Sequence, residues 1–193
     1  MINLAVTRLQ EKLQSNLGFL DLVGGVAHAQ KIKIGEQVRT LPATPDPENP
    51  DGYIWLTPDS ARSGIAYFEV LRSERPEPLA GGNAYIYRAA VRCVVWLNTA
   101  RLSPKAAAPV VMAMVASQLQ GRYDDAYPVT NIRVTPEGEA VKSPELFGKY
   151  TYNEAETQFL MLPFEYFAFD FALSFALISD CPVTNIVKID AVC

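Results

Sequence analysis

The segment near residue 170 alternates between large apolar side chains and small or polar ones. Between residues 167 and 177 every odd position is large and apolar: Phe167, Phe169, Phe171, Leu173, Phe175 and Leu177. A period of two is the pattern of a β-strand that buries one face. The apolar run is interrupted by Pro163, Glu165 and Asp170. An aspartate at the centre of a membrane-spanning helix costs about 3 kcal/mol, which disfavours a membrane span here. We therefore predict a long strand with one aromatic face.

Two other segments have helical spacing. Residues 2 to 23 carry leucines at intervals of three to five, separated by polar and charged side chains, which is typical of an amphipathic helix. Gly24 and Gly25 are predicted to end it. Ser103 followed by Pro104 has the pattern of a helix N-terminus, and apolar positions with helical spacing continue to Gly121. Pro109 is predicted to delay the start of this second helix or to bend it.

Alternation predicts further strands. The clearest runs from residue 85 to 97, with arginines on one face, and shorter strands are predicted at residues 27 to 38, 53 to 57, 66 to 71, 132 to 135 and 186 to 189. Residues 154 to 160 are predicted as a helical turn or a strand entry. Proline-rich segments at about residues 39–52 and 72–84 are predicted to be irregular loops, because proline donates no hydrogen bond to a sheet. The alternative prediction for the second segment is the tip of a projecting hairpin.

The order of these elements predicts an α+β fold: a mixed, mainly antiparallel sheet with two amphipathic helices packed on one face. The aromatic face near residue 170 is expected to hold the helices, since each large apolar side chain contributes about 1.5 to 3 kcal/mol when buried. The opposite face, small residues plus Asp170, is left to solvent or to a neighbouring subunit. The length of 193 residues predicts a single domain over residues 1–193.

The charge balance narrows the range of partners. The formal net charge is −4 and charged residues make up 20% of the chain. The protein therefore presents no overall basic field to a phosphate backbone, which disfavours duplex nucleic acid as its main partner. No secretion signal is expected, because Glu11 and Lys12 stand where a signal peptide is most apolar.

The cysteines indicate a reducing compartment. They are odd in number and contain no C-x-x-C pair: Cys93, Cys181 and Cys193. Cys93 falls within a predicted strand and is expected in the core. A disulfide between Cys181 and Cys193 is the alternative that the spacing leaves open.

The sequence contains no motif for a common catalytic or cofactor site. There is no Gly-x-Ser-x-Gly, no phosphate-binding glycine loop and no metal-ligand pattern, so no cofactor, no metal and no catalytic residue is expected. His28 is the single histidine and is interpreted as structural. Asp124 and Asp125 are interpreted as a solvated turn, because an adjacent pair lacks the further oxygen ligands of a calcium loop.

The layout resembles a known family. An N-terminal helix, a long strand ending at Trp96-Leu97-Asn98, a helix near residues 104 to 121 and the late aromatic run from Tyr166 to Phe175 are together similar to the tail-terminator and neck proteins of tailed bacteriophages. The resemblance implies a structural virion protein without enzymatic activity. It also implies a homomeric, commonly hexameric ring that contacts the tail tube and the head connector, with DNA passing through the lumen and no membrane. Its location would be the virion, and the host cytoplasm during assembly.

A ring interface is heterologous, so one patch on each subunit must fit a different patch on the next. Residues 72 to 83 are predicted to be a reaching arm with charged neighbours on the adjacent strand. The candidate interface residues are Arg72, Glu74, Arg75, Glu77, Arg88 and Arg92. A solvated loop is the alternative interpretation of this segment. Two rival functions stay open: an adaptor subunit of a contractile injection-type assembly, and a small enzyme built around His28 and a carboxylate.

Overall fold

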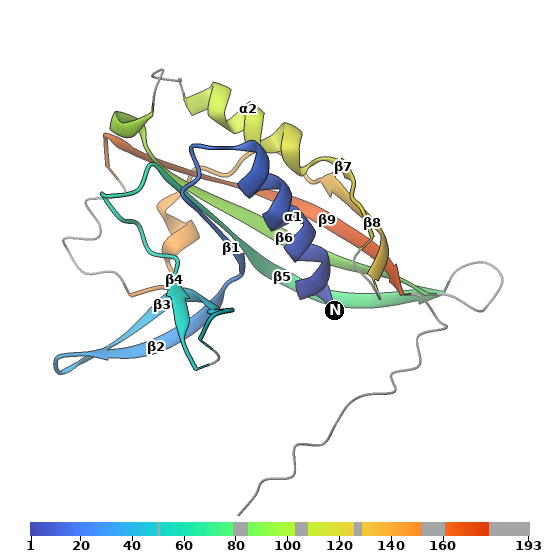
Figure 1. Ribbon diagram of the computed structural model, residues 1–193, viewed down its shortest axis with the longest axis horizontal. Coiled ribbons are helices and arrows are strands. Elements are labelled where there is room, and N and C mark those ends of the chain that lie inside the picture. The colour runs from blue at the N-terminus through green and yellow to red at the C-terminus, as the bar shows by residue number, and fades with distance from the viewer. Residues whose placement is uncertain (50, 79–84, 103–107, 126–128, 152–160, 178–193) are drawn as a thin grey trace, which may run out of the picture.

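The protein is built on a six-stranded sheet with both helices on one face, which confirms the predicted α+β class (Figure 1). The computed structural model describes residues 1–49, 51–78, 85–102, 108–125, 129–151 and 161–177. The sheet order is β1-β5-β6-β9-β8-β7, and only the β1–β5 pair is parallel. Its strands are β1 (Leu22–Val26), β5 (Gly64–Pro78), β6 (Tyr85–Asn98), β7 (Gly121–Arg122), β8 (Val129–Pro136) and β9 (Phe164–Leu177).

A smaller antiparallel sheet lies at one end of the molecule (Figure 1). It consists of β2 (His28–Ile34), β3 (Gln37–Pro45) and β4 (Tyr53–Trp55). Gly35 lies between the first two strands with φ +62°, a conformation that glycine adopts without strain. The single strand predicted over residues 27 to 38 is therefore wrong: this segment holds β2, a tight turn and the start of β3.

The aromatic face of β9 is the floor of the main core. Phe167, Phe171 and Phe175 are almost fully buried there, and Phe171 meets Phe68 of β5 edge to face with ring centroids 6.3 Å apart. The helices α1 (Ile2–Asn16) and α2 (Ala108–Leu119) supply the other side of this core. The predicted strand and the predicted helix face are thus both confirmed.

The opposite face of the sheet is covered at one end only. A second apolar cluster forms there from the start of β5, the end of β6 and the segment at residues 141–150, which includes the 3₁₀ helix η2 (Pro144–Phe147). Trp96 and Tyr67 are its largest buried side chains. A short 3₁₀ helix, η1 (Thr99–Arg101), follows β6. The other half of this face carries no such cover among the described residues.

The first helix is shorter than predicted. It ends at Asn16, and Gly24 and Gly25 lie within β1 instead of terminating the helix. Leu17 and Leu20 remain buried beyond the helix end, so the leucine spacing continues where the helix does not. A side chain at Gly24 would come within 2.6 Å of Leu56, which explains why this strand carries glycine.

Both proline-rich segments predicted as loops are partly strand. In the first, Leu41, Pro42 and Ala43 are buried in β3, and the carbonyl of Pro42 accepts a hydrogen bond from the backbone of Leu56 at 2.9 Å. In the second, β5 continues to Pro78. Its neighbour β1 pairs only as far as Phe68, so the later prolines stand on an edge strand, where no neighbour needs their missing N–H group. Residues 72–78 therefore form one strand of a hairpin with β6, whereas the predicted projecting tip lies outside the described residues.

The second helix, α2, is described from Ala108 to Leu119 and contains Pro109, so its predicted delayed start is not tested by the described residues. Several other predictions fall outside the described residues. These are the helix start at Ser103, the hairpin tip at residues 79–84, the element at residues 154–160, the strand at residues 186–189, and Cys181 and Cys193.

The packing of Phe171 predicts a large loss of stability when its ring is removed. Phe171→Ala should lower the free energy of unfolding by about 3 to 5 kcal/mol, because it deletes a fully buried ring and leaves a cavity. Chemical denaturation monitored by circular dichroism measures the change. Tyr85→Ala on β6 is the matched control, since Tyr85 is 50% exposed and should cost less than about 1 kcal/mol. Equal losses in the two variants would contradict this description of the core.

Candidate functional site

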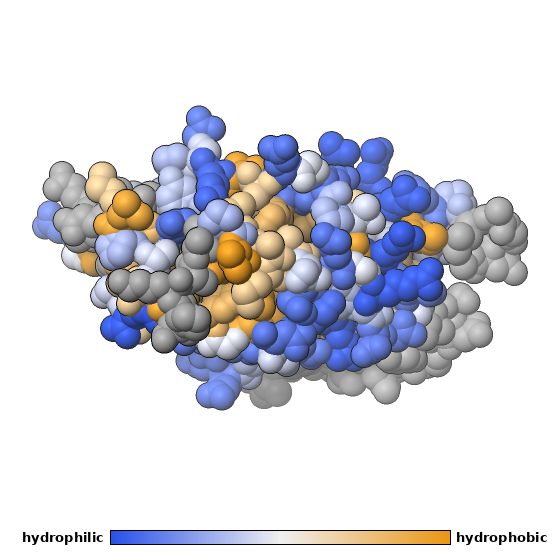
Figure 2. All heavy atoms as spheres, turned by 90° about the horizontal axis from the view of Figure 1, so that it is seen from above, coloured by the Kyte–Doolittle hydropathy of each residue, from blue (hydrophilic) through white to orange (hydrophobic). Residues whose placement is uncertain are grey.

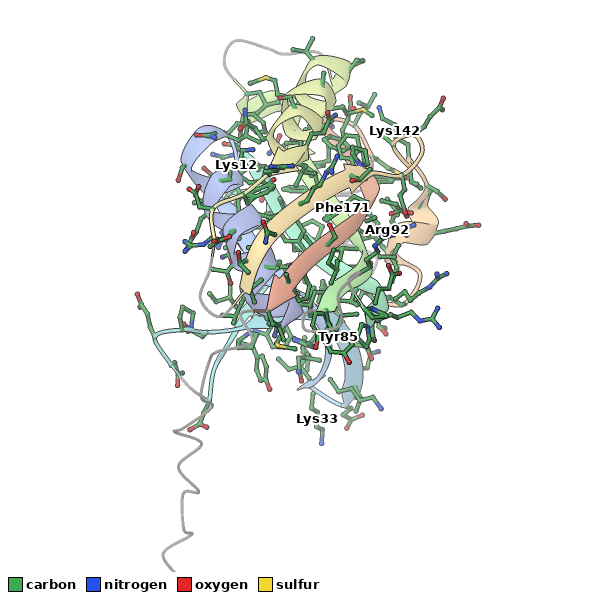
Figure 3. All side chains as sticks on the ribbon, turned by 90° about the vertical axis from the view of Figure 1, so that its right-hand side faces the viewer. Lys12, Lys33, Tyr85, Arg92, Lys142 and Phe171 are labelled. Atoms are coloured by element: carbon green, nitrogen blue, oxygen red, sulfur yellow. The ribbon has the colours of Figure 1, made fainter. Side chains whose placement is uncertain are left out.

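The open half of the sheet, on the face away from the helices, gathers most of the arginines of the chain. Cross-strand register places six of the ten arginines on this half-face: Arg72, Arg75, Arg88, Arg92, Arg122 and Arg133. We call it the arginine face. Figure 3 shows Arg92 on the side of the sheet opposite to α1, which carries Lys12.

A hydrogen-bonded ion pair marks the inner border of the arginine face. Arg92 of β6 donates from Nε and Nη2 to the two carboxylate oxygens of Asp170 on β9, at 2.6 and 2.8 Å. These hydrogen bonds raise the pKa of the Arg92 guanidinium above its ordinary value, and they outweigh the opposing effect of burial. Glu69, nearly fully buried, adds to the same shift.

Glu69 closes the covered end of the face. Its carboxylate accepts a hydrogen bond from the Tyr150 hydroxyl at 2.6 Å and lies 2.9 Å from the Lys149 ammonium. The buried charge is thereby both hydrogen-bonded and paired, as a buried carboxylate requires. This contact fastens residues 149–150 over the sheet and sets the limit of the open half.

Five of the six predicted interface residues lie together on the arginine face. Arg72 pairs in register with Ala90, Arg75 with Arg88, and Glu77 with Ile86. The Arg88 guanidinium lies 3.2 Å from the Glu77 carboxylate, and both side chains are more than half exposed. Glu74 differs: its carboxylate lies 3.6 Å from the amino group of Met1, at the start of α1.

One row of side chains crosses five strands of the arginine face. Register makes direct neighbours of Arg75 and Arg88, of Arg88 and Ser174, of Ser174 and Arg133, and of Arg133 and Arg122. We call these five residues the arginine row. Sequence reasoning missed Arg122 and Arg133, because their place depends on how β8 pairs with β9. The signal available in the sequence was the place of Arg133 between two apolar strand residues, Ile132 and Val134.

A β-bulge in β8 places Arg133 in this row. The pairing shifts between Thr130 and Arg133, and Asn131 has φ 55°, a conformation that asparagine tolerates. The backbone N–H of Asn131 donates to the Asp125 carboxylate at 2.9 Å, which holds the bulge. Because the successive residues Thr130 and Asn131 both face outward, Ile132 is buried and Arg133 is exposed.

The arginine row borders a hollow of about 760 Å³. Arg88, Arg122 and Arg133 line it, together with the hydroxyl-bearing Thr135 and Ser174. Asp125 is the one carboxylate among its lining residues, and it already accepts the hydrogen bond from Asn131. The hollow therefore offers mainly hydrogen-bond donors and positive charge.

The residue considered for catalysis lies elsewhere, and so does the cysteine that was expected in the core. His28 is exposed at the start of β2, opposite Ala43 of β3. Cys93 is fully buried, and burial raises the pKa of its thiol, which makes it unreactive. Among the residues that the structure describes, no three of the side chains that commonly bind metals form a group.

The exposed side of α2 is apolar. Val110 is 54% and Met114 42% exposed, and Pro109 and Ala113 beside them are also exposed. Figure 2 shows this surface as an apolar patch with hydrophilic side chains around it. We call these four residues the α2 patch.

Within the described part of the chain, no helix is long and apolar enough to cross a membrane.

No known protein-family model matches the chain, and no curated protein matches it.

The two ion pairs of the arginine face predict different coupling energies. A double-mutant cycle of Arg92→Ala and Asp170→Ala should give about 1 to 2 kcal/mol, because the pair is bidentate and about three-quarters buried. The same cycle on Arg88 and Glu77 is the control and should give less than about 0.5 kcal/mol, because both side chains are exposed. Urea denaturation of the single and double variants measures both. Coupling of equal size would contradict a structural role for the Arg92–Asp170 pair.

Proposed function

We propose that the protein is a ring-forming structural subunit, of the kind that terminates a phage tail tube and joins it to the head. Its partners would be further copies of itself, the tail tube and the head connector, in the virion. The fold class agrees with the resemblance noted from the sequence. The observation that carries the proposal is the α2 patch, an exposed apolar helix face on a protein whose core is already complete without it.

A second surface complements this patch. The paired strands β5 and β6 run past the N-terminal end of α1 (Figure 1), where β9 still pairs with β6 as far as Ile86; we call this end of the sheet the arm. Leu71 and Tyr85 on this arm are 47% and 50% exposed. A closed ring needs two different patches on every subunit. The arm of one subunit and the α2 patch of the next meet that requirement, and the exposed apolar side chains provide the burial that stabilises such a contact.

The proposal predicts that charges on the α2 patch abolish assembly. Val110→Glu combined with Met114→Glu should weaken subunit association at least roughly 30-fold, the effect of losing about 2 kcal/mol at an interface centre. Both side chains are exposed, so the melting temperature should stay within a few degrees of the wild type. Light scattering on a size-exclusion column and negative-stain imaging, with and without tail tubes of its own phage, measure assembly.

The control variant carries the same added charge at other exposed sites, Gln37→Glu with Gln120→Glu. It should assemble like the wild type. A wild-type protein that neither forms rings nor attaches to tail tubes would overturn the proposal. Equal assembly by the two variants would remove the α2 patch from the interface.

A further inference from the structure

The arginine row holds four positive charges close to one another, and among the described residues only one of them has an acidic partner. Arg75 stands directly opposite Arg88, and Arg122 directly opposite Arg133. Like charges directly opposite each other on a sheet are destabilising. Of these four arginines only Arg88 has an ion pair, with Glu77, among the described residues. One face of the sheet thus keeps two unfavourable pairs, Arg75 with Arg88 and Arg122 with Arg133. Their presence indicates that an anionic ligand binds there.

The row also has the shape of a binding site. Neighbouring strands are about 4.8 Å apart, so the five positions span about 19 Å across the sheet. Ser174 stands at the midpoint, with Arg88 on one side and Arg133 on the other. A group bound above its hydroxyl is within reach of both guanidinium groups, and Thr135 adds a second hydroxyl to the lining of the hollow. Ala172 and Ala176 make part of the floor small, beside the larger Ile86, so an extended chain can lie close to the strands there.

The planar guanidinium group can form paired hydrogen bonds with either a phosphate or a carboxylate. The position and shape of the site must therefore distinguish between these two ligands. A peptide gains affinity at the edge of a sheet, through main-chain hydrogen bonds and pockets for alternate side chains. The arginine row crosses the face of the sheet and borders one broad hollow, whereas a bound peptide strand needs a sheet edge. An acidic peptide would also lose the entropy of ordering its long side chains. A chain of phosphates carries its charge along the backbone itself.

We propose that the arginine row binds an extended chain of phosphate groups, through the charge and hydrogen bonds of Arg75, Arg88, Arg122 and Arg133 around Ser174. The shared chemistry is that of a single-stranded polynucleotide backbone and of inorganic polyphosphate. No aromatic side chain belongs to the row, so bases do not stack on it and binding does not depend on nucleotide sequence. This inference goes beyond the proposed function and does not require ring formation.

The test measures binding of a fluorescein-labelled oligodeoxythymidylate of about 12 nucleotides, a typical site length for single strands, by fluorescence anisotropy at several salt concentrations. Neutralisation of four phosphates on a single strand predicts a slope of log K against log salt near −2.8. Arg122→Ser with Arg133→Ser should reduce this slope to about −1.4 and weaken binding at least tenfold. Replacement of the same two residues by lysine should restore most of the slope.

The control removes two positive charges from the small sheet, Lys31→Ser with Lys33→Ser, both exposed on β2. It has the same net charge as the row variant and should bind like the wild type. The row variant should be folded and at least as heat-stable as the wild type, since it removes a like-charge pair. Equal weakening by the two variants would overturn the proposal, because only net charge would then matter.

Competition identifies the source of the phosphate. If linear polyphosphate displaces the oligonucleotide, the result supports the shared chemistry. If polyphosphate fails to displace it, the site is assigned to a polynucleotide backbone. Polyphosphate binding without oligonucleotide binding assigns it to inorganic polyphosphate. Polyglutamate that competes as well as polyphosphate would overturn the proposal in favour of an acidic polypeptide, and so would the absence of salt-dependent binding to either phosphate chain.

Discussion

The alternation of side chains along β9 is the constraint on which the rest of the structure depends. Because successive residues of a strand point to opposite faces, Phe167, Phe171 and Phe175 all turn to one side and are buried there. Burying them requires an apolar layer, and α1 and α2 provide it. On the other side of the same strand, Phe164, Tyr166 and Ala168 belong to the second apolar cluster, and the later positions are Asp170 and small residues, which need no cover.

This division gives the two faces of the sheet different roles. The helix face supplies stability through a continuous apolar core. The opposite face is closed at one end by the cluster around Trp96 and open at the other, where six arginines gather. The net charge of −4 hides this concentration, because it counts the acidic residues of the whole chain, of which Glu69, Glu77 and Asp170 lie on this face. The net charge of the whole chain therefore does not predict the charge of this local surface.

Much of the fold could be predicted from the sequence, because β9, β6 and α2 carry clear periodicities. The end of α1 could not, since Leu17 and Leu20 keep the helical spacing while packing outside the helix. For the proline-bearing part of β5 a loop and a hairpin both stayed open, because prolines are tolerated there only in an edge strand, which the pairing with β1 reveals. Arg133 joins the arginine row only because of the bulge at Asn131. A regular pairing would have turned it to the other face.

Arginine-specific modification of the free protein tests the central claim, that the half-face opposite the helices is open and available for binding. Phenylglyoxal treatment followed by mass spectrometry reports how fast each arginine reacts. The account predicts rapid modification of Arg75, Arg88, Arg122 and Arg133, and slow modification of Arg39, which is 6% exposed. Reaction of the four arginines at the slow rate of Arg39 would contradict it, because this half of the sheet would then be covered.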